Sequence, residues 1–165
     1  MPLSTDCIKC EKPLDLRCSL DIQQLYSKII MEQSRSTDHK HELPDATVTE
    51  KGHNPSCGDE IELSLRLSGD VIEKASFTGH GCAISQASTS LLCELIEGNT
   101  VGEAQKKVNT FLGMIKGEIT DDEVLEETLG DALALKSISF MPQRVKCAVL
   151  AWRTLDDILK SEPKA

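Results

Sequence analysis

An alternating run from Glu60 to Ser68 constrains the fold of this chain most strongly. Its apolar and polar residues exchange places at every step over nine residues, which is the pattern of a strand with one buried face. The apolar members are Ile61, Leu63, Leu65 and Leu67. Ser68-Gly69-Asp70 supplies a turn, and residues 71–78 read as a second strand. We therefore predict an antiparallel hairpin.

This hairpin brings two cysteines to one end of the predicted sheet. Cys57 precedes the first strand and Cys82 follows the second, and antiparallel strands place those two ends on the same edge. Asp59 follows Cys57 with only Gly58 between them. Because glycine carries no Cβ to obstruct a tight turn, both flanking side chains can leave the turn on one side.

A third thiol belongs with these residues. Cys147 lies near the start of a helix that we expect to begin around Pro142, since proline suits the first helical position. Three thiols and a carboxylate form a tetrahedral donor set for which zinc is the commonest occupant. Helix N-termini at Cys82 and Cys147 favour the thiolate form. We predict a metal site made of Cys57, Asp59, Cys82 and Cys147, with one exchangeable coordination position because the Asp59 oxygen is a harder ligand.

Three neighbouring residues compete with this assignment. His80 and His53 lie close in sequence to Cys82 and Cys57, so either histidine remains an alternative fourth or competing ligand. Cys93 lies eleven residues beyond Cys82 in a predicted helix, about 16 Å along its axis. That distance is too great for one ion, so we predict that Cys93 is a buried apolar side chain.

The rest of the chain reads mainly as helices. A helix capped by Ser19 and a short strand over residues 46–50 precede the hairpin. The helices expected after the hairpin span residues 82–97, residues 100–117 with a Thr100 and Glu103 capping box, shorter segments over 121–135, and a last helix from Pro142. The predicted apolar stripes are Ile22, Leu25, Ile29 and Ile30 in the first helix; Ile84, Ala87, Leu91 and Leu95 in the helix over 82–97; and Val145, Ala148, Ala151 or Trp152, Leu155 and Ile158 in the last helix. We predict an α+β fold in which helices cover one face of a small antiparallel sheet of about three strands.

The N-terminal residues have no clear hydrophobic period. We expect a flexible extension over 1–18, followed by a single domain over 19–165. The extension holds Cys7, Cys10 and Cys18, and its one CxxC is only half of a zinc site, so the role of these thiols stays open.

Composition limits which binding partners and which cellular compartment suit the chain. Its 27 acidic and 18 basic residues give a net charge of -9, which argues against binding to a nucleic-acid backbone. An odd count of seven cysteines and a polar N-terminus indicate a reducing cytoplasm instead of a secretory route. No apolar run has the length of a membrane span.

Three motifs give a specific family resemblance. Residues 54–59, Asn-Pro-Ser-Cys-Gly-Asp, residues 79–85, Gly-His-Gly-Cys-Ala-Ile-Ser, and residues 144–148, Arg-Val-Lys-Cys-Ala, followed by Trp152, occur in this order. They closely resemble the SufU branch of the IscU/NifU-like iron–sulfur cluster assembly proteins, over about residues 25–160. The resemblance implies a SufE/NifU-like fold and zinc at the four predicted ligands.

The resemblance also implies a partner and a reaction. The partner is a SufS-type, pyridoxal-phosphate-dependent cysteine desulfurase, which in this family takes over a zinc ligand position with its own histidine. The thiol matching Cys57 then accepts the persulfide sulfur, Arg144 assists, and the sulfur passes on to downstream iron–sulfur assembly or acceptor proteins. This protein would thus be a sulfurtransferase-like sulfur acceptor and desulfurase activator.

Two features favour the SufU branch over the scaffold branch. Scaffold members carry a histidine before the last cysteine, where this chain has Lys146, and they lack the insertion around residues 113–131. A protonated lysine cannot ligate iron. Residues 34–42 depart from the family pattern, which leaves the docking of the first helix open. Two other hypotheses remain: a scaffold that binds iron or a [2Fe–2S] cluster, and a non-catalytic interaction module stabilised by zinc.

Overall fold

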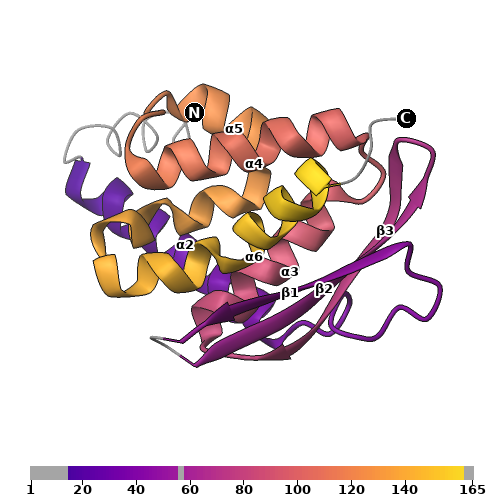
Figure 1. Cartoon of the computed structure of the whole chain (residues 1–165). Helices are drawn as coiled ribbons and strands as arrows, with labels where there is room; N and C mark the ends of the chain where they lie inside the picture. Colours follow the sequence, from indigo (N-terminus) through magenta and orange to yellow (C-terminus); the bar gives the residue numbers. More distant parts are fainter. Residues whose placement is uncertain (1–14, 56–57, 162–165) are drawn as a thin grey trace, which may run out of the picture.

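The structure is a computed structural model that describes residues 15–55 and 58–161, with side chains described from residue 23 onward. A three-stranded antiparallel sheet lies along one side, and the helices cover its inner face (Figure 1). The predicted α+β fold is confirmed. The elements are α2 (Asp15–Arg35), β1 (Val48–Asn54), β2 (Asp59–Ser68), β3 (Val71–His80), α3 (Ala83–Ile96), α4 (Val101–Lys116), α5 (Asp122–Leu129), the 3-10 helix η1 (Gly130–Phe140) and α6 (Pro142–Ser161).

The sheet has the order β1-β2-β3, and both pairs of neighbours are antiparallel. The predicted hairpin is therefore confirmed, with β3 running two residues beyond the expected Thr78. Ile61 lies opposite Gly52 on one side and Gly79 on the other, which fixes the register at the end of the sheet. Alternate apolar residues of β2 form the inner face, and those at positions 61, 63 and 65 are completely buried.

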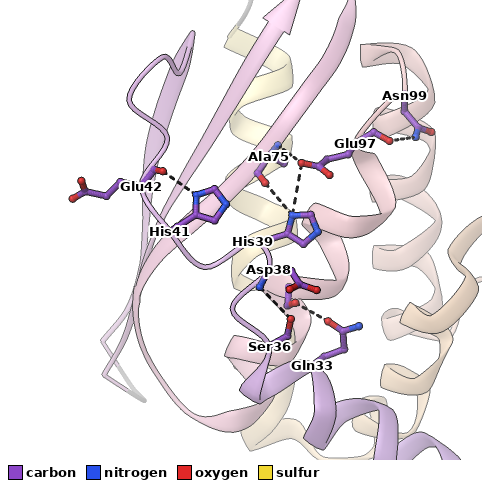
Figure 2. A network of polar contacts seen from close by, with 10 residues as sticks. Gln33, Ser36, Asp38, His39, His41, Glu42, Ala75, Glu97 and Asn99 are labelled. Atoms are coloured by element: carbon purple, nitrogen blue, oxygen red, sulfur yellow. Dashed lines mark hydrogen bonds and ion pairs between the residues drawn. The ribbon is translucent and has the colours of Figure 1, made fainter.

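The free edge of β3 is covered by side chains and loops (Figure 2). The Phe77 N–H donates to the carbonyl of His39 at 2.8 Å, and the Ala75 N–H donates to the Glu97 carboxylate at 3.0 Å. The His39 ring Nδ1 lies 3.2 Å from the Ala75 carbonyl and 3.7 Å from Glu97. Exposed strand edges invite pairing with other chains. These contacts occupy backbone groups of Ala75 and Phe77 that would otherwise be open to pairing with another strand.

Helix α3 is central to the helical layer. The hydroxyl of Ser88 donates to the carbonyl of Ala148 at 2.5 Å and accepts from the indole N–H of Trp152 at 2.9 Å, which joins α3 to α6. On another side, Ser90 donates to Gln33 of α2. The buried face of α3 is wider than the predicted apolar stripe, because neighbouring elements also bury the serine and threonine positions of this helix. Its apolar members Ala87 and Leu91 are buried, whereas Ile84 and Leu95 are only partly buried.

Helix α6 begins at the predicted Pro142, and the face that it packs inward includes Ala148, Trp152 and Leu155. The Trp152 ring stacks on Phe111 of α4, with ring centroids 3.9 Å apart and planes 4° apart. The predicted capping box of α4 is confirmed, since Thr100 and Glu103 each bond the other's backbone N–H. These contacts fix α6, and Cys147 with it, against the core.

Helix α2 corrects the predicted start of the first helix. It begins at Asp15, four residues before Ser19, so Ser19 is not its cap. No residue between these positions breaks a helix, and the preceding breaker is Pro13. Leu25 is 54% exposed and so does not face the core as predicted. Cys7 and Cys10 lie outside the described residues, and Cys18 lies in the part of α2 whose side chains are not described.

Among the described residues, no helix combines the length and apolar character that crossing a membrane requires.

Candidate metal centre

Three of the four predicted ligands meet at one end of the sheet. One ligand atom each from Asp59, Cys82 and Cys147 lies within 4.8 Å of the other two. Asp59 is the first residue of β2, Cys82 is the N-cap of α3, and Cys147 lies in the second turn of α6. Cys57, the fourth predicted ligand, lies outside the described residues.

The two oxygens of Asp59 have different environments. Oδ1 accepts a hydrogen bond from the backbone N–H of Cys82 at 3.0 Å. Oδ2 is buried and has no hydrogen-bond partner, in a side chain that is 0% exposed. A buried carboxylate oxygen without a partner carries a large desolvation cost. A cation beside Oδ2 would remove that cost, so the carboxylate fits the metal that the donor set predicts.

Two glycines allow the chain to pass close to this carboxylate. A Cβ on Gly81 would lie 2.6 Å from Asp59 Oδ1 and 2.3 Å from Ser85 Oγ. A Cβ on Gly79 would lie 2.1 Å from the Glu60 carbonyl oxygen, and the φ of +124° at this residue is one that side chains rarely adopt. The Gly-His-Gly segment therefore brings Cys82 against Asp59 because neither glycine carries a side chain.

Cys82 and Cys147, the two predicted cysteine ligands that the structure describes, differ in exposure. Cys82 is partly exposed, whereas Cys147 is only 1% exposed. The carbonyl of Cys82 accepts from the Gln86 N–H at 3.0 Å and from the Ser85 hydroxyl at 3.2 Å, which anchors the start of α3. Because the helix dipole acts mainly within the first turn, it assists the sulfur of Cys82 more than that of Cys147. Cys147 lies in the second turn of α6, within the first two turns where the sequence placed it.

The alternative histidine ligands face away from the centre. His53 and His80 are the direct cross-strand partners of Glu60, so the three side chains share one face of the sheet. Glu60 directly follows Asp59, and successive side chains of a strand point to opposite faces. His53, Glu60 and His80 are all exposed. The structure therefore places both histidines on the outer face, opposite Asp59.

The sequence analysis also singled out Arg144, Lys146 and Cys93. Arg144 and Lys146 are exposed in the first turns of α6. Cys93 is completely buried, as predicted, and burial and the nearby Glu97 carboxylate raise the pKa of its thiol. Cys93 therefore behaves as an apolar core residue.

Sequence reasoning missed Asn54, the last residue of β1. Asn54 is the cross-strand partner of Asp59, and its side chain is buried at the same end of the sheet. The only sequence signal is an amide at the end of a short strand, directly before the turn with Cys57. The strand register that pairs Asn54 with Asp59 was needed to recognise it.

A family model for the NifU-like N terminal domain matches residues 25–160. The chain belongs to this family. This confirms the relationship that the three motifs predicted, and the match covers every element from α2 to α6 at least in part.

Individual relatives of this NifU-like chain come from both branches. It is 38% identical over 136 residues to the zinc-dependent sulfurtransferase SufU of Bacillus subtilis, covering 82% of this chain and 90% of that protein. It is 41% identical over 138 residues to the iron–sulfur cluster assembly scaffold protein IscU of Thermotoga maritima, covering 84% and 94%.

Solved structures agree with the fold of this NifU-like domain. The crystal structure of FiSufU from Fervidobacterium islandicum AW-1 matches with a TM-score of 0.76 and 38% identity, over 83% of this chain and 98% of that one. The N-terminal part of a NifU-like protein from Brucella abortus matches with a TM-score of 0.71 over 84% and 94%, and at 18% identity it shows the fold alone.

Proposed function

We propose that this protein is a zinc-dependent sulfur acceptor in iron–sulfur cluster assembly. It would take persulfide sulfur from a SufS-type cysteine desulfurase in the cytoplasm, where thiols stay reduced. The observation that carries this proposal is the meeting of Asp59, Cys82 and Cys147, with the Asp59 Oδ2 buried and without a partner. The zinc-dependent sulfurtransferase named among the relatives supports it.

The metal would be held by Cys57, Asp59, Cys82 and Cys147. Thiolate and carboxylate donors suit zinc, which when bound keeps cysteine ligands deprotonated at neutral pH. The protein's own residues prepare this donor set. The Cys82 N–H orients Asp59, and the packing of α6 against α3 positions Cys147.

The sulfur transfer itself is a thiol exchange. A thiolate of this protein, which we assign to Cys57, attacks the terminal sulfur of the desulfurase persulfide. A new S–S bond forms on the acceptor, and the S–S bond of the donor breaks, which leaves the desulfurase cysteine as a thiolate. The rate depends on the thiolate fraction and on access to the attacking sulfur. The exposed Arg144 cation, one helical turn before Cys147, would stabilise the anionic sulfur species.

The alternative is a scaffold that assembles and transfers a [2Fe–2S] cluster. The relationship to an IscU scaffold and a cysteine-rich centre favour this alternative, because such clusters are held by thiolates. Lys146 argues against it, since its ammonium offers no lone pair to iron at the position before Cys147. The SufU reading therefore accounts for more of this sequence.

Desulfurase turnover tests the proposal. Turnover is measured with and without the zinc-loaded protein, and then with Asp59→Ala and with the control His53→Ala, which changes the outer face of the sheet. We expect stimulation by wild type and by the control, and its loss in Asp59→Ala. If wild type leaves turnover unchanged, the sulfur-acceptor function is wrong.

Metal analysis separates the two functions. Protein purified without oxygen should contain one zinc ion per chain, in keeping with one donor set, and no visible chromophore. A visible iron–sulfur absorption with stoichiometric iron and sulfide would instead identify a scaffold.

A further inference from the structure

Asn54 carries a buried amide donor that the fold does not use. Its side chain is 6% exposed, and its Nδ2 is buried without a hydrogen-bond partner in the part of the chain that the structure describes. Leaving such a donor unsatisfied is unfavourable, because burial removes its hydrogen bonds to water without replacing them. The adjoining turn does not need this donor, because it is closed by the Gly58 N–H bonding the backbone carbonyl of Asn54 at 2.9 Å.

The strand register places this amide beside the metal centre. Asn54 and Asp59 are directly paired across β1 and β2, so their side chains share the inner face. Directly paired residues have Cβ atoms about 4.5–5.5 Å apart. The amide of Asn54 therefore lies within a side chain's length of the carboxylate that faces the centre.

The two unpartnered atoms do not satisfy each other. Asp59 and Asn54 are cross-strand neighbours, yet neither Asp59 Oδ2 nor Asn54 Nδ2 has a hydrogen-bond partner in the described part of the chain. A carboxylate oxygen suits a cation, whereas an amide N–H is only a donor and needs an acceptor. The acceptors that a thiolate-rich metal centre offers are its sulfur atoms.

We propose that the side-chain amide of Asn54 donates a hydrogen bond to an anionic sulfur held at the metal centre, which makes Asn54 a positioning residue for sulfur transfer. This inference rests on the proposed function. The sulfur is either a cysteine thiolate of the resting protein or the terminal sulfur of the transferred persulfide. Both are anionic acceptors, and hydrogen bonds to charged groups are the stronger ones.

The test compares Asn54→Ala, which removes the donor, with Asn54→Ser, which keeps a short O–H donor at the same position. The control is Ser76→Ala. Ser76 Oγ is also buried without a partner, but Ser76 lies four residues before the end of β3, about 13 Å along the strand. Thermal unfolding of each metal-free variant shows whether the fold is retained.

The first measurement uses cobalt-substituted protein, because sulfur-to-cobalt charge-transfer absorption responds to hydrogen bonds at the ligated sulfurs. The second measures the lifetime of the protein-bound persulfide after loading by the desulfurase. We expect Asn54→Ala to shift the charge-transfer band or to shorten the persulfide lifetime by roughly five- to tenfold. Asn54→Ser should restore a large part of the effect, and Ser76→Ala should match wild type.

Each outcome decides a separate point. A band shift in the resting protein identifies a cysteine thiolate as the acceptor, and a change in persulfide lifetime alone identifies the incoming sulfur. If Asn54→Ala leaves both quantities unchanged, or if Asn54→Ser behaves like Asn54→Ala, the inference is wrong. Failure of wild type to accept sulfur would refute the proposed function, while the cobalt spectrum would still decide the role of Asn54.

Discussion

The carboxylate of Asp59 accepts a hydrogen bond from the backbone N–H of Cys82 at 3.0 Å, across 23 residues of sequence. One oxygen thus joins the start of β2 to the N-cap of α3, while the other is left free in a buried position. The bond fixes the direction of the carboxylate before any ion arrives. Asp59 therefore has a structural role beside its proposed role as a ligand, and mutations can separate the two.

Two substitutions of Asp59 make this separation. Asp59→Asn keeps an oxygen that can accept the Cys82 N–H but loses the anionic ligand, whereas Asp59→Ala loses both. We expect both variants to bind zinc more weakly than wild type in a chelator competition. In metal-free protein, Asp59→Asn should be at least as stable as wild type, because it removes a buried charge. Asp59→Ala should be less stable than Asp59→Asn by about 1–2 kcal/mol in urea unfolding. Equal stability of the two variants would show that the bond contributes nothing.

Gly81→Ala should weaken zinc binding by displacing Asp59 or Ser85, since the added Cβ would lie 2.6 Å from Asp59 Oδ1 and 2.3 Å from Ser85 Oγ. Gly102→Ala is the matched control, because the nearest atom to its Cβ is 3.9 Å away. Gly102 is the second residue of α4 and is exposed, so that change should alter stability by no more than about 0.5 kcal/mol. Zinc competition and thermal unfolding measure both effects, and unchanged zinc affinity in Gly81→Ala would contradict the geometry.

The cysteines should react with alkylating reagents in a fixed order. Burial raises the pKa of the Cys93 thiol, and Glu97 adds to this effect, so Cys93 has little thiolate and no access at neutral pH. Cys82 is partly exposed. In metal-free native protein we expect iodoacetamide to label Cys82 within minutes and Cys93 only after unfolding. Peptide mass spectrometry reads the order, and early labelling of Cys93 would refute its assignment to the core.

Asp156 should make the stability of the protein depend on pH. Partial burial acts to raise the pKa of this carboxyl, but hydrogen bonds from Lys160 and Gln105 outweigh it and hold the pKa below its usual value. Because the folded-state pKa is depressed, the ionised carboxylate contributes stability above the unfolded-state pKa of about 3.9. This contribution is lost as the pH falls from there through the folded-state pKa. Asp156→Asn should therefore be less stable than wild type at pH 7, and the difference should shrink towards pH 3. Urea unfolding at both pH values is the measurement; a difference that persists unchanged at pH 3 would exclude this linkage.

The hairpin could be predicted because its evidence is local. Alternation over residues 60–68 and the following turn define two antiparallel strands, and their geometry brings Asp59 and Cys82 together without further information. The helix start at Pro142 was also predictable, but the meeting of Cys147 with Asp59 and Cys82 depends on how α6 packs against α3. The hairpin and the helix start depend on periodicity and turn chemistry, which a single sequence displays.

Features that depend on packing could not be predicted in the same way. Ser88 and Thr89 appear polar in the sequence, yet both are buried because their hydroxyls donate to the backbone carbonyls of Ala148 and Ser85. The exposure of Leu25 likewise depends on which elements lie beside α2. The position of Asn54 beside the candidate metal centre became clear only from the strand register, which pairs Asn54 with Asp59.

The stacking of Trp152 on Phe111 also gives the molecule an intrinsic optical reporter. Trp152 is the single tryptophan of the chain, it is completely buried, and its indole N–H bonds Ser88. It lies five residues after Cys147 on the same helix. Its fluorescence therefore arises from one known environment on the helix that carries a proposed ligand, so loosening of that helix can be followed by emission without attaching a dye.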